Sequence, residues 1–519
     1  MTASAIERFF QSGLSGANIN NGNNLKQKLS ELKVAPTGLS NDSRFTKKGD
    51  IFFAYPGSNQ DGRTHISEAI EKGCSVVIWE RDGWVWNANH QLPNMGFNNV
   101  RALMGEFAAL FYGDPTNGMH VLGVTGTNGK TTCVNWLAEA FFLLGRDSAC
   151  IGTLGLNIPG KKIDVSHCDT RTTPDALALQ RTFKDLTESG VSCVSIEVSS
   201  HALTQNRLNG TRVNVAIFTN LSHDHLDYHG TFELYGLAKA QLFLFDTLSY
   251  AVINIDDNFG TDLAASLKRK DKRVITYSTA KKNADIHVSQ LALSIDGSKF
   301  SVVTPWGSKE IKSHIFGEFN VSNMLAVLGG LLCSGVDFLK ACDAIGDLRH
   351  SEGRLQRVGE KYNRRVYIDY AHTPAALSLV LSTLKSLLSS NGRVITVFGA
   401  GGDRDKDKRV LMGRAVLEFS HIAIVTTDNP RYETPEKIIE QVTGGNESQF
   451  LVELDRRSAI FRAIELANKN DIICIAGKGH EKYQDVCGER IPFDDYAVAE
   501  EYLKKLHPDS NGHQDCTHV

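Results

Sequence analysis

The sequence predicts an α/β protein of three domains: a small α/β domain, a central P-loop-type domain with a mostly parallel sheet, and a C-terminal Rossmann-like domain. At 519 residues the chain exceeds what one hydrophobic core usually supports. Short β-branched runs alternate with helical patterns, and polar loops directly follow these runs, as in parallel sheets. We expect domains at residues 1–118, 119–350 and 351–505, followed by a polar tail at residues 506–519.

Charge and cysteine usage exclude several classes of protein. The 56 basic and 59 acidic residues give a net charge of −3, so we expect neither a nucleic-acid partner nor a membrane surface. The 10 cysteines are scattered without a C-x-x-C pair, which is typical of reduced thiols in a cytoplasmic protein. No long apolar window and no secretory signal pattern is visible, so we expect a cytoplasmic location.

The first domain is predicted from two strand-like runs, residues 50–54 and 74–78, with a short helix at residues 66–72 between them. Polar turns at residues 40–44 and 57–62 flank the first strand. Loops at strand ends bind ligands in small α/β domains, but such turns also occur without a ligand. The sequence leaves both interpretations open.

The second domain opens with a strand, a Gly-rich turn at residues 126–129 and a helix that begins at Lys130. This geometry directs backbone N–H groups and the positive end of a helix dipole at a phosphate. Lys130 can reach β- and γ-phosphate oxygens, and the Thr131 hydroxyl can bind Mg²⁺. The strict Walker pattern has glycine where this chain has Val124, so we interpret the loop as a variant. The alternative is a turn that binds nothing.

Two further strands of this domain end in polar residues. Glu197 follows the strand at residues 191–196, where an acid faces the metal of a phosphate loop. The strand at residues 213–218 precedes a segment, residues 223–229, with three histidines and two aspartates. A zinc site is disfavoured because the order does not fit H-E-x-x-H and no cysteine accompanies it. A Mg²⁺ and phosphate neighbourhood fits better.

Two later helices carry polar residues whose role the sequence leaves open. Lys239 lies on a predicted helix at residues 232–245, and composition alone predicts a surface lysine with its stem on apolar neighbours. Asn320 and Asn323 lie at the start of an apolar helix that runs through residue 332. These asparagines either cap the helix or contact a base or ribose.

In the third domain, a charged loop follows several of the predicted strands. The predicted strands are residues 366–370, 394–398, 422–426 and 472–476, and the loops that follow three of them are residues 399–406, 428–431 and 477–481. Arginines, a lysine, a histidine and acids at one sheet edge suit a small zwitterionic ligand, since arginine binds carboxylates bidentately. The loop at 401–406 lacks G-x-G-x-x-G spacing, so we exclude a dinucleotide site.

Taken in order, these motifs resemble the Mur ligase family. The residues that carry the resemblance are Gly126–Thr132, Glu197 with Ser199-Ser200-His201, Asp224–Asp227, Lys239, Asn320, Asn323, Gly353-Arg354 and Asp369–Pro374. The resemblance covers nearly the whole chain. It implies an ATP-dependent ligase that adds an amino acid to a UDP-linked cell-wall precursor through an acyl phosphate, with ATP as co-substrate and Mg²⁺ as cofactor.

Within the family, Asp428-Asn429-Pro430-Arg431 resembles the members that add meso-2,6-diaminopimelate to the D-Glu of UDP-N-acetylmuramoyl-L-Ala-D-Glu. Diaminopimelate has a distal carboxylate that Arg431 can bind and that lysine lacks. The nearest alternative is a lysine-adding member. A folylpolyglutamate-type ligase, a P-loop NTPase without an acceptor, and a scaffold without chemistry are more distant alternatives.

The resemblance implies roles for individual residues. It implies catalytic roles for Lys130, Glu197, His225 and Lys239, with Lys239 carbamylated, and Mg²⁺ ligation by Thr131, Glu197, His225 and Lys239. It implies ATP binding by Gly126, Thr127, Asn128, Gly129, Lys130, Thr131, Thr132, Asn320, Asn323, Arg354 and Asp369. The implied UDP-sugar-peptide residues are Ser43, Ser58, Asn59, Gln60, Thr172, Thr173, Ser199, Gln205 and Arg207. The implied diaminopimelate residues are Arg404, Asp428, Asn429, Pro430, Arg431, Gly477 and Glu481.

The expected partners are therefore small molecules: ATP, the UDP-muramoyl dipeptide and the amino acid. We expect a monomer whose domains close around one acyl phosphate. The sequence departs from some relatives at Asn41, at Arg171 and in the loop at 58–60, which weakens the individual uridine-side residues rather than the family assignment.

Overall fold

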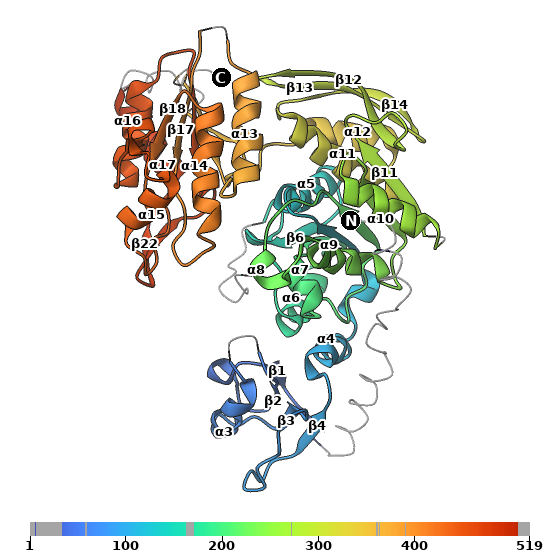
Figure 1. Cartoon of the computed structure of the whole chain (residues 1–519). Helices are drawn as coiled ribbons and strands as arrows, with labels where there is room; N and C mark the ends of the chain where they lie inside the picture. The colour runs from blue at the N-terminus through green and yellow to red at the C-terminus, as the bar shows by residue number, and fades with distance from the viewer. Residues whose placement is uncertain are drawn as a thin grey trace, which may run out of the picture. The chain divides into compact units, whose positions relative to one another are not determined.

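The structure is a computed structural model of the 519-residue chain. It describes residue 6 and residues 34–57, 60–161, 171–270, 272–359, 362, 364–389 and 391–506 (Figure 1). The chain divides into two compact units. The first comprises Met1–Ser289, Ser301–Ile311 and Ser322–Gly346, and the second comprises Gln290–Phe300, Lys312–Val321 and Asp347–Val519.

A four-stranded parallel sheet opens the first unit. Its order is β1 (Gly38–Ser40), β2 (Asp50–Ala54), β3 (Val76–Glu80) and β4 (Asn94–Phe97). Strand β2 is buried on both faces, because Ile51 and Phe53 join one hydrophobic cluster and Phe52 and Ala54 join another. The helices around this sheet are α3 (Ile66–Glu71) and α4 (Val100–Phe111), with short 3₁₀ turns at Ser43–Phe45, Gly62–His65 and Pro115–Gly118.

The largest sheet has ten strands in the order β14-β13-β12-β11-β10-β9-β5-β8-β6-β7. Its centre is β5 (His120–Thr125), which pairs in parallel with β8 (Cys193–Glu197) and β9 (Val215–Phe218). The other strands are β6 (Ser148–Gly152), β7 (Gly155–Asn157), β10 (Tyr250–Asn254), β11 (Val274–Ser278), β12 (Ile286–Ser294), β13 (Gly297–Thr304) and β14 (Gly307–Ser313). Except for the antiparallel edge strand β7, strands β6 to β12 pair in parallel, so the carboxyl ends of β5, β8 and β9 share one edge.

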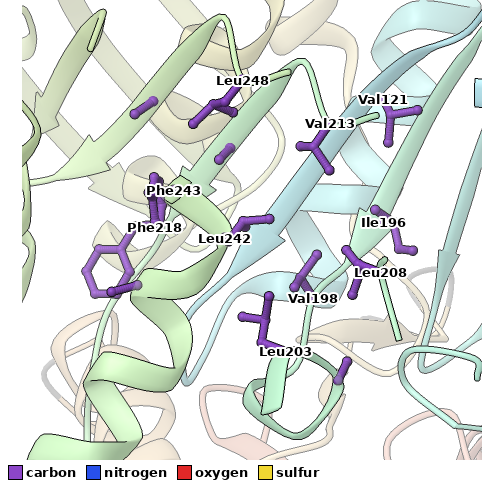
Figure 2. Packing of buried hydrophobic residues seen from close by; sticks show 14 of the residues in the cluster. Val121, Ile196, Val198, Leu203, Leu208, Val213, Phe218, Leu242, Phe243 and Leu248 are labelled. Carbon is purple, nitrogen blue, oxygen red and sulfur yellow. The ribbon is translucent and has the colours of Figure 1, made fainter. Parts of the chain in front are cut away.

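Helices cover this sheet and build its core. They are α5 (Lys130–Leu143), α6 (Ala176–Glu188), α7 (Ser200–Thr204), α8 (Leu226–His229), α9 (Phe232–Ala240), a 3₁₀ turn at Gln241–Leu244, α10 (Asn258–Lys268), α11 (Glu318–Cys333) and α12 (Phe338–Asp347). Figure 2 shows buried apolar side chains of this core, including Val198 and Leu242. Gly123 of β5 lies beneath them, since a Cβ there would lie 3.2 Å from Leu242 and 3.3 Å from Val198. A larger residue would therefore push on the strand that leads into residue 126.

The second unit contains a six-stranded sheet in the order β15-β16-β20-β17-β18-β19. The strands are β15 (Gln356–Val358), β16 (Arg365–Asp369), β17 (Val394–Phe398), β18 (Ile422–Val425), β19 (Leu451–Val452) and β20 (Ile472–Ala476), parallel except for β15 against β16. Hydrophobic clusters cover both faces. The helices are α13 (Pro374–Ser386), α14 (Asp407–Phe419), α15 (Pro435–Thr443), α16 (Arg456–Leu466) and α17 (Asp495–Leu506), and β21 (Tyr483–Val486) with β22 (Glu489–Pro492) forms a hairpin.

The predicted α/β class is confirmed, and each predicted strand corresponds to an observed one within a few residues. The sequence analysis predicted none of the strands β1, β4, β6, β7, β10 to β15, β19, β21 and β22. Of these, β6 and β10 are buried, whereas others such as β4 and β14 are short or largely exposed. The predicted helix at 232–245 ends as α9 at Ala240 and continues as a 3₁₀ turn. Helix α17 includes Leu506, whereas residues 507–519 lie outside the described part.

No helix in the described part of the chain combines the length and the hydrophobicity that a membrane span requires. The domain boundaries predicted at residues 118, 350 and 505 stay predictions.

Candidate active site

The Gly-rich turn lies between β5 and α5, as predicted. Gly126 has φ +150° and Gly129 has φ +87°, both in the region that favours glycine. A Cβ at residue 126 would lie 1.9 Å from Thr219 Oγ1, and one at residue 129 would lie 2.5 Å from Asn323 Oδ1. The loop is closely held, since Thr127 N and Asn128 N donate to Asn220 at 2.8 and 2.9 Å. We call Gly126–Thr132 the phosphate loop.

Two lysines meet at one carbonyl oxygen of the phosphate loop. Lys130 Nζ donates to the oxygens of Gly126 and Thr127 at 2.9 Å each, and Lys239 Nζ donates to the Gly126 oxygen at 2.7 Å. Lys130 and the positive end of the α5 dipole make this loop a positive site for a polyanion such as a nucleotide phosphate.

Lys239 is not the surface lysine that composition predicted. Its side chain is 2% exposed and lies 4.3 Å from the centre of the Tyr235 ring. The prediction was wrong because the Gly126 carbonyl and the Tyr235 ring enclose the side-chain nitrogen. Burial first, and then the charge of Lys130, lower the pKa of Lys239 well below its usual value, while Asp224 opposes the shift. The site therefore favours a neutral amine at Lys239.

Glu197 lies at the end of β8, one strand from the phosphate loop. It is 1% exposed, and its carboxylate accepts hydrogen bonds from Thr153 N at 2.8 Å and from Thr153 Oγ1 at 3.3 Å. The carboxylate also packs on Gly152, where a Cβ would lie 2.2 Å from Glu197 Oε1. Its direction is therefore set by its neighbours rather than by solvent.

The donors near this loop fit magnesium better than zinc. Within the described residues, no three His, Cys, Asp or Glu side chains are arranged to hold a metal ion by themselves. Mg²⁺ usually takes only one or two protein oxygens and completes its shell with phosphates and water. The Thr131 hydroxyl at the start of α5 and the Glu197 carboxylate at the end of β8 provide that kind of donor, since β8 pairs with β5, the strand that leads into the phosphate loop.

Imidazole rings from α7 and from the segment after β9 form one group. His201 lies 4.9 Å from His225, 5.4 Å from His229 and 4.1 Å from the Tyr228 ring, measured between ring centres. Burial lowers the pKa of His201 and of His229 to about 4, and it lowers the pKa of His225 as well. These rings are therefore neutral near pH 7.

The residues expected to hold the UDP-sugar peptide fall in two places. Five of them form one network. Thr173 Oγ1 donates to the backbone oxygen of Glu197 at 2.7 Å, and Arg207 Nη1 donates to the backbone oxygen of Thr173 at 2.7 Å. The network also contains Thr172, Ser199 and Gln205. Ser43 donates to Glu68 at 2.7 Å in the small sheet, and Gln60 is exposed there. Ser58 and Asn59 lie outside the described residues.

The expected nucleotide residues are divided between the two units. Asn323 belongs to the first unit, where it contacts the phosphate loop. Asn320, Arg354 and Asp369 belong to the second. Asn320 Nδ2 donates to the Phe316 oxygen at 2.9 Å, so it is not the N-cap of α11. Asp369 accepts from Leu355 N and Ala371 N at 2.8 Å each, and the Arg354 guanidinium lies 4.8 Å from the Tyr370 ring.

Three loops of the second unit follow β17, β18 and β20, and we call Gly401–Arg404, Asp428–Arg431 and Gly477–Glu481 the C-terminal loops. A Cβ at Gly401 would lie 3.0 Å from Arg431 Nη1 and 3.7 Å from Arg404 Cγ, so both arginines border that glycine. Arg431 Nη1 donates to the Gly402 oxygen at 2.6 Å. A Cβ at Gly477 would lie 2.5 Å from Asp428 Oδ2. The structure thus gathers Arg404, Asp428, Asn429, Pro430, Arg431, Gly477 and Glu481 at one edge of the sheet, as the sequence predicted.

Three buried cations of the second unit were not singled out from the sequence. Lys478 is fully buried and contacts Asn429 and Glu481. Arg409 is also fully buried and binds both carboxylate oxygens of Glu433 at 2.8 and 2.9 Å, together with the Gly401 oxygen at 2.9 Å. Arg456 pairs with the buried Asp495 at 2.7 Å. Only Lys478 had a sequence signal, because it lies inside a loop already predicted to bind a ligand.

Three family models match this chain in succession. They are the Mur ligase family, catalytic domain, at residues 36–112, the Mur ligase middle domain at residues 124–331, and the Mur ligase, glutamate ligase domain, at residues 353–479. A UDP-N-acetylmuramoyl-L-alanyl-D-glutamate–2,6-diaminopimelate ligase of Chromobacterium violaceum is 42% identical over 477 residues, which cover 92% of this chain and 96% of that protein. The chain belongs to the Mur ligase family.

Other relatives agree with this membership. The enzyme of the same name from Neisseria meningitidis serogroup B is 40% identical over 92% of this chain and 96% of its own length. A solved structure with that name is 37% identical, covers 91% of this chain and 95% of its own, and superposes with a TM-score of 0.66. MurF ligase from Thermotoga maritima, solved with ADP, is 18% identical over 90% of this chain and 98% of its own, with a TM-score of 0.59, and shares the fold.

As a Mur ligase, the chain is an enzyme of the ATP-dependent class that forms amide bonds. The family also accounts for the three-domain plan and for the two sets of loops at the carboxyl ends of parallel strands.

Proposed function

We propose that this Mur ligase uses ATP to join meso-2,6-diaminopimelate to the D-Glu of UDP-N-acetylmuramoyl-L-Ala-D-Glu, a step in the synthesis of the peptidoglycan precursor. The observation that carries the proposal is the loop Asp428–Arg431, where Arg431 lies against Gly401 at the same sheet edge as Arg404 and Glu481. Relatives at about 40% identity over nine-tenths of the chain bear the name of that enzyme.

The phosphate loop suits the first step of this reaction. ATP transfers its γ-phosphoryl group to the free carboxylate of the dipeptide, which gives an acyl phosphate and ADP. Negative charge spreads over the transferring group, and Lys130 with the start of α5 lies where it can stabilise that charge. The amine of the acceptor then attacks the acyl carbon, loses a proton and displaces phosphate.

Magnesium would be held by Thr131, Glu197 and His225 together with phosphate oxygens, and it would neutralise charge on the phosphates. Lys239 would be a further ligand after reaction of its amine with CO₂, which forms an N–C bond and releases a proton to give an anionic carbamate. A buried amine with a strongly lowered pKa supports that reaction, because only the neutral amine is nucleophilic.

The C-terminal loops suit the acceptor amino acid. Diaminopimelate carries a second carboxylate and a second ammonium at its distal end. Arg431 and Arg404 can bind the carboxylate, and Glu481 and Asp428 can accept from the ammonium. L-Lysine has the distal ammonium but no distal carboxylate, so it offers the two arginines no carboxylate to bind.

The deciding experiment measures phosphate release from ATP with UDP-N-acetylmuramoyl-L-Ala-D-Glu and either meso-diaminopimelate or L-lysine. We expect the wild-type protein to require the nucleotide dipeptide and to prefer diaminopimelate. Arg431→Ala should lower kcat/KM for diaminopimelate by about 10- to 100-fold and change kcat/KM for lysine little. Arg414→Ala, at an exposed arginine of α14, is the matched control and should behave like wild type.

Each other outcome selects an alternative. A preference for lysine would retain the ligase chemistry and replace the proposed acceptor. Hydrolysis of ATP that is indifferent to both acceptors would indicate an NTPase instead.

A further inference from the structure

Lys478 is an unusual residue of the C-terminal loops. It follows β20 directly, and its side chain is 0% exposed. Lysine is rarely buried completely, because removing an ammonium group from water costs free energy unless partners replace the water. The partners of Lys478 therefore explain why this position tolerates a charge.

Both polar partners of Lys478 belong to the proposed acceptor site. Its Nζ lies 3.0 Å from Glu481 Oε2 and 3.1 Å from Asn429 Oδ1. The Tyr483 ring centre lies 5.6 Å from the same nitrogen, within the range of a cation–π contact. The ammonium thus joins the loop after β18 to the loop after β20.

The Lys478 ammonium determines which way the Asn429 amide faces. An ammonium group only donates hydrogen bonds, so the amide must present its oxygen. The same oxygen also accepts from Asp485 N at 2.9 Å. The amide nitrogen then faces Glu481 and donates to its Oε2 at 2.8 Å. A flipped amide would place N–H groups against two donors, so a single orientation is stable.

Glu481 is held asymmetrically as a result. Its Oε2 accepts from both Lys478 and Asn429, whereas no described residue donates to its Oε1. The side chain keeps 19% of its surface exposed. The carboxylate therefore has one oxygen fixed by the protein and one oxygen with acceptor capacity for a ligand.

We propose that Lys478 is a positioning residue of the acceptor site, which orients the Asn429 amide and holds Glu481 so that its Oε1 receives the distal ammonium of the diamino acid. This inference rests on the proposed function. Lys478 acts through Asn429 and Glu481, so its loss should affect the acceptor substrate and leave the other two substrates unchanged.

The test uses steady-state kinetics of the full-length enzyme with each of the three substrates varied in turn. We expect Lys478→Met and Lys478→Gln to raise KM for meso-diaminopimelate about 10- to 100-fold, with kcat, KM for ATP and KM for the UDP-dipeptide within about 3-fold of wild type. Lys482→Met is the matched control: Lys482 is half-exposed, pairs with Glu352 and Asp494, and should leave all three KM values unchanged.

A double-mutant cycle with Glu481→Gln separates positioning from general structure. If Lys478 acts through Glu481, Lys478→Met should raise KM for diaminopimelate by less than about 3-fold in the Glu481→Gln background. The same factor in both backgrounds, or equal increases in all three KM values, would overturn the inference.

Three further outcomes are distinguishable. If neither neutral variant folds, Lys478→Arg decides: a KM increase confined to diaminopimelate supports the inference, and a uniform change contradicts it. If the wild-type enzyme does not depend on diaminopimelate, the proposed function fails before any variant is compared. If it does depend on it and Lys478→Met has the wild-type KM, only the inference fails.

Discussion

The phosphate loop and the C-terminal loops both lie at the carboxyl ends of parallel strands, yet their charged side chains are paired differently. At the phosphate loop, Lys130 and Lys239 converge on one carbonyl oxygen, and no described carboxylate forms an ion pair with Lys239. At the C-terminal loops, Arg409 pairs with Glu433 and Lys478 with Glu481. The first arrangement suits a polyanion that brings its own negative charge. The second suits a zwitterion, because the site is already balanced.

The largest effect is expected when a balanced pair of the second unit is broken. Arg409→Met should lower the free energy of unfolding by about 3–5 kcal/mol, since it removes the donor to the Glu433 carboxylate and to the oxygens of Gln441 and Gly401. Urea unfolding followed by circular dichroism measures this, while tryptophan fluorescence reports on the first unit, which contains all 5 tryptophans. Arg457→Met, at an exposed pair with Glu501, is the control and should cost less than about 1 kcal/mol. A loss at Arg409 as small as this control would contradict the comparison.

Removal of a cation from the phosphate loop should instead affect catalysis. We expect Lys130→Met to reduce ATP-dependent product formation about 10²- to 10³-fold, which is roughly 3–4 kcal/mol of barrier. Stability should change little, because the hydrogen bonds of Lys130 to Gly126 and Thr127 go to backbone oxygens of its own loop. Lys184→Met, at an exposed i,i+4 pair with Glu188, provides the control. A change below about 3-fold in turnover would show that Lys130 does not stabilise the transferring phosphoryl group.

Lys239 adds a further test of the phosphate loop, because the carbamate proposed for it is an anion. Lys239→Arg introduces a permanent positive charge and should lower turnover about 100-fold, whereas Lys239→Glu should retain roughly tenfold more activity than Lys239→Arg. Removal of CO₂ should also lower wild-type activity, and added bicarbonate should restore it. Wild-type activity that ignores CO₂, together with an active Lys239→Arg enzyme, would argue against the carbamate.

The smallest effect contrasts two glutamates by pH. Glu106 of α4 is 9% exposed, and burial raises its pKa to about 7, whereas hydrogen bonds from Arg409 lower the pKa of Glu433 to about 2. A raised folded-state pKa gives stability that is complete below the unfolded value and is lost as pH rises through about 7.

Glu106→Gln should therefore stabilise the protein by about 2 kcal/mol at pH 8.5 and by little at pH 5. For Glu433→Gln the pH dependence has the opposite sign. The stability that the Glu433 carboxylate contributes through its lowered pKa is present at neutral pH and is lost as pH falls from about 4.5 toward 2. Urea unfolding curves at these pH values measure both. Equal effects of Glu106→Gln at pH 5 and pH 8.5 would contradict the burial of an unpaired carboxylate.

The sequence alone determined the α/β class, the strands that precede each polar loop, and the phosphate loop, because these depend on local patterns of apolar and small residues. Only the tertiary structure decided how the charges are balanced. Composition predicted that Lys239 is a surface lysine. It is buried because Gly126, 113 residues away in the chain, supplies a hydrogen-bond acceptor for its Nζ. Lys478 and Asn429 are 49 residues apart, and Arg409 and Glu433 are 24 apart. Such pairs form only when the tertiary fold brings distant segments to one edge of a sheet, as for the loops after β18 and β20, which have β17 between them. No local pattern can reveal them.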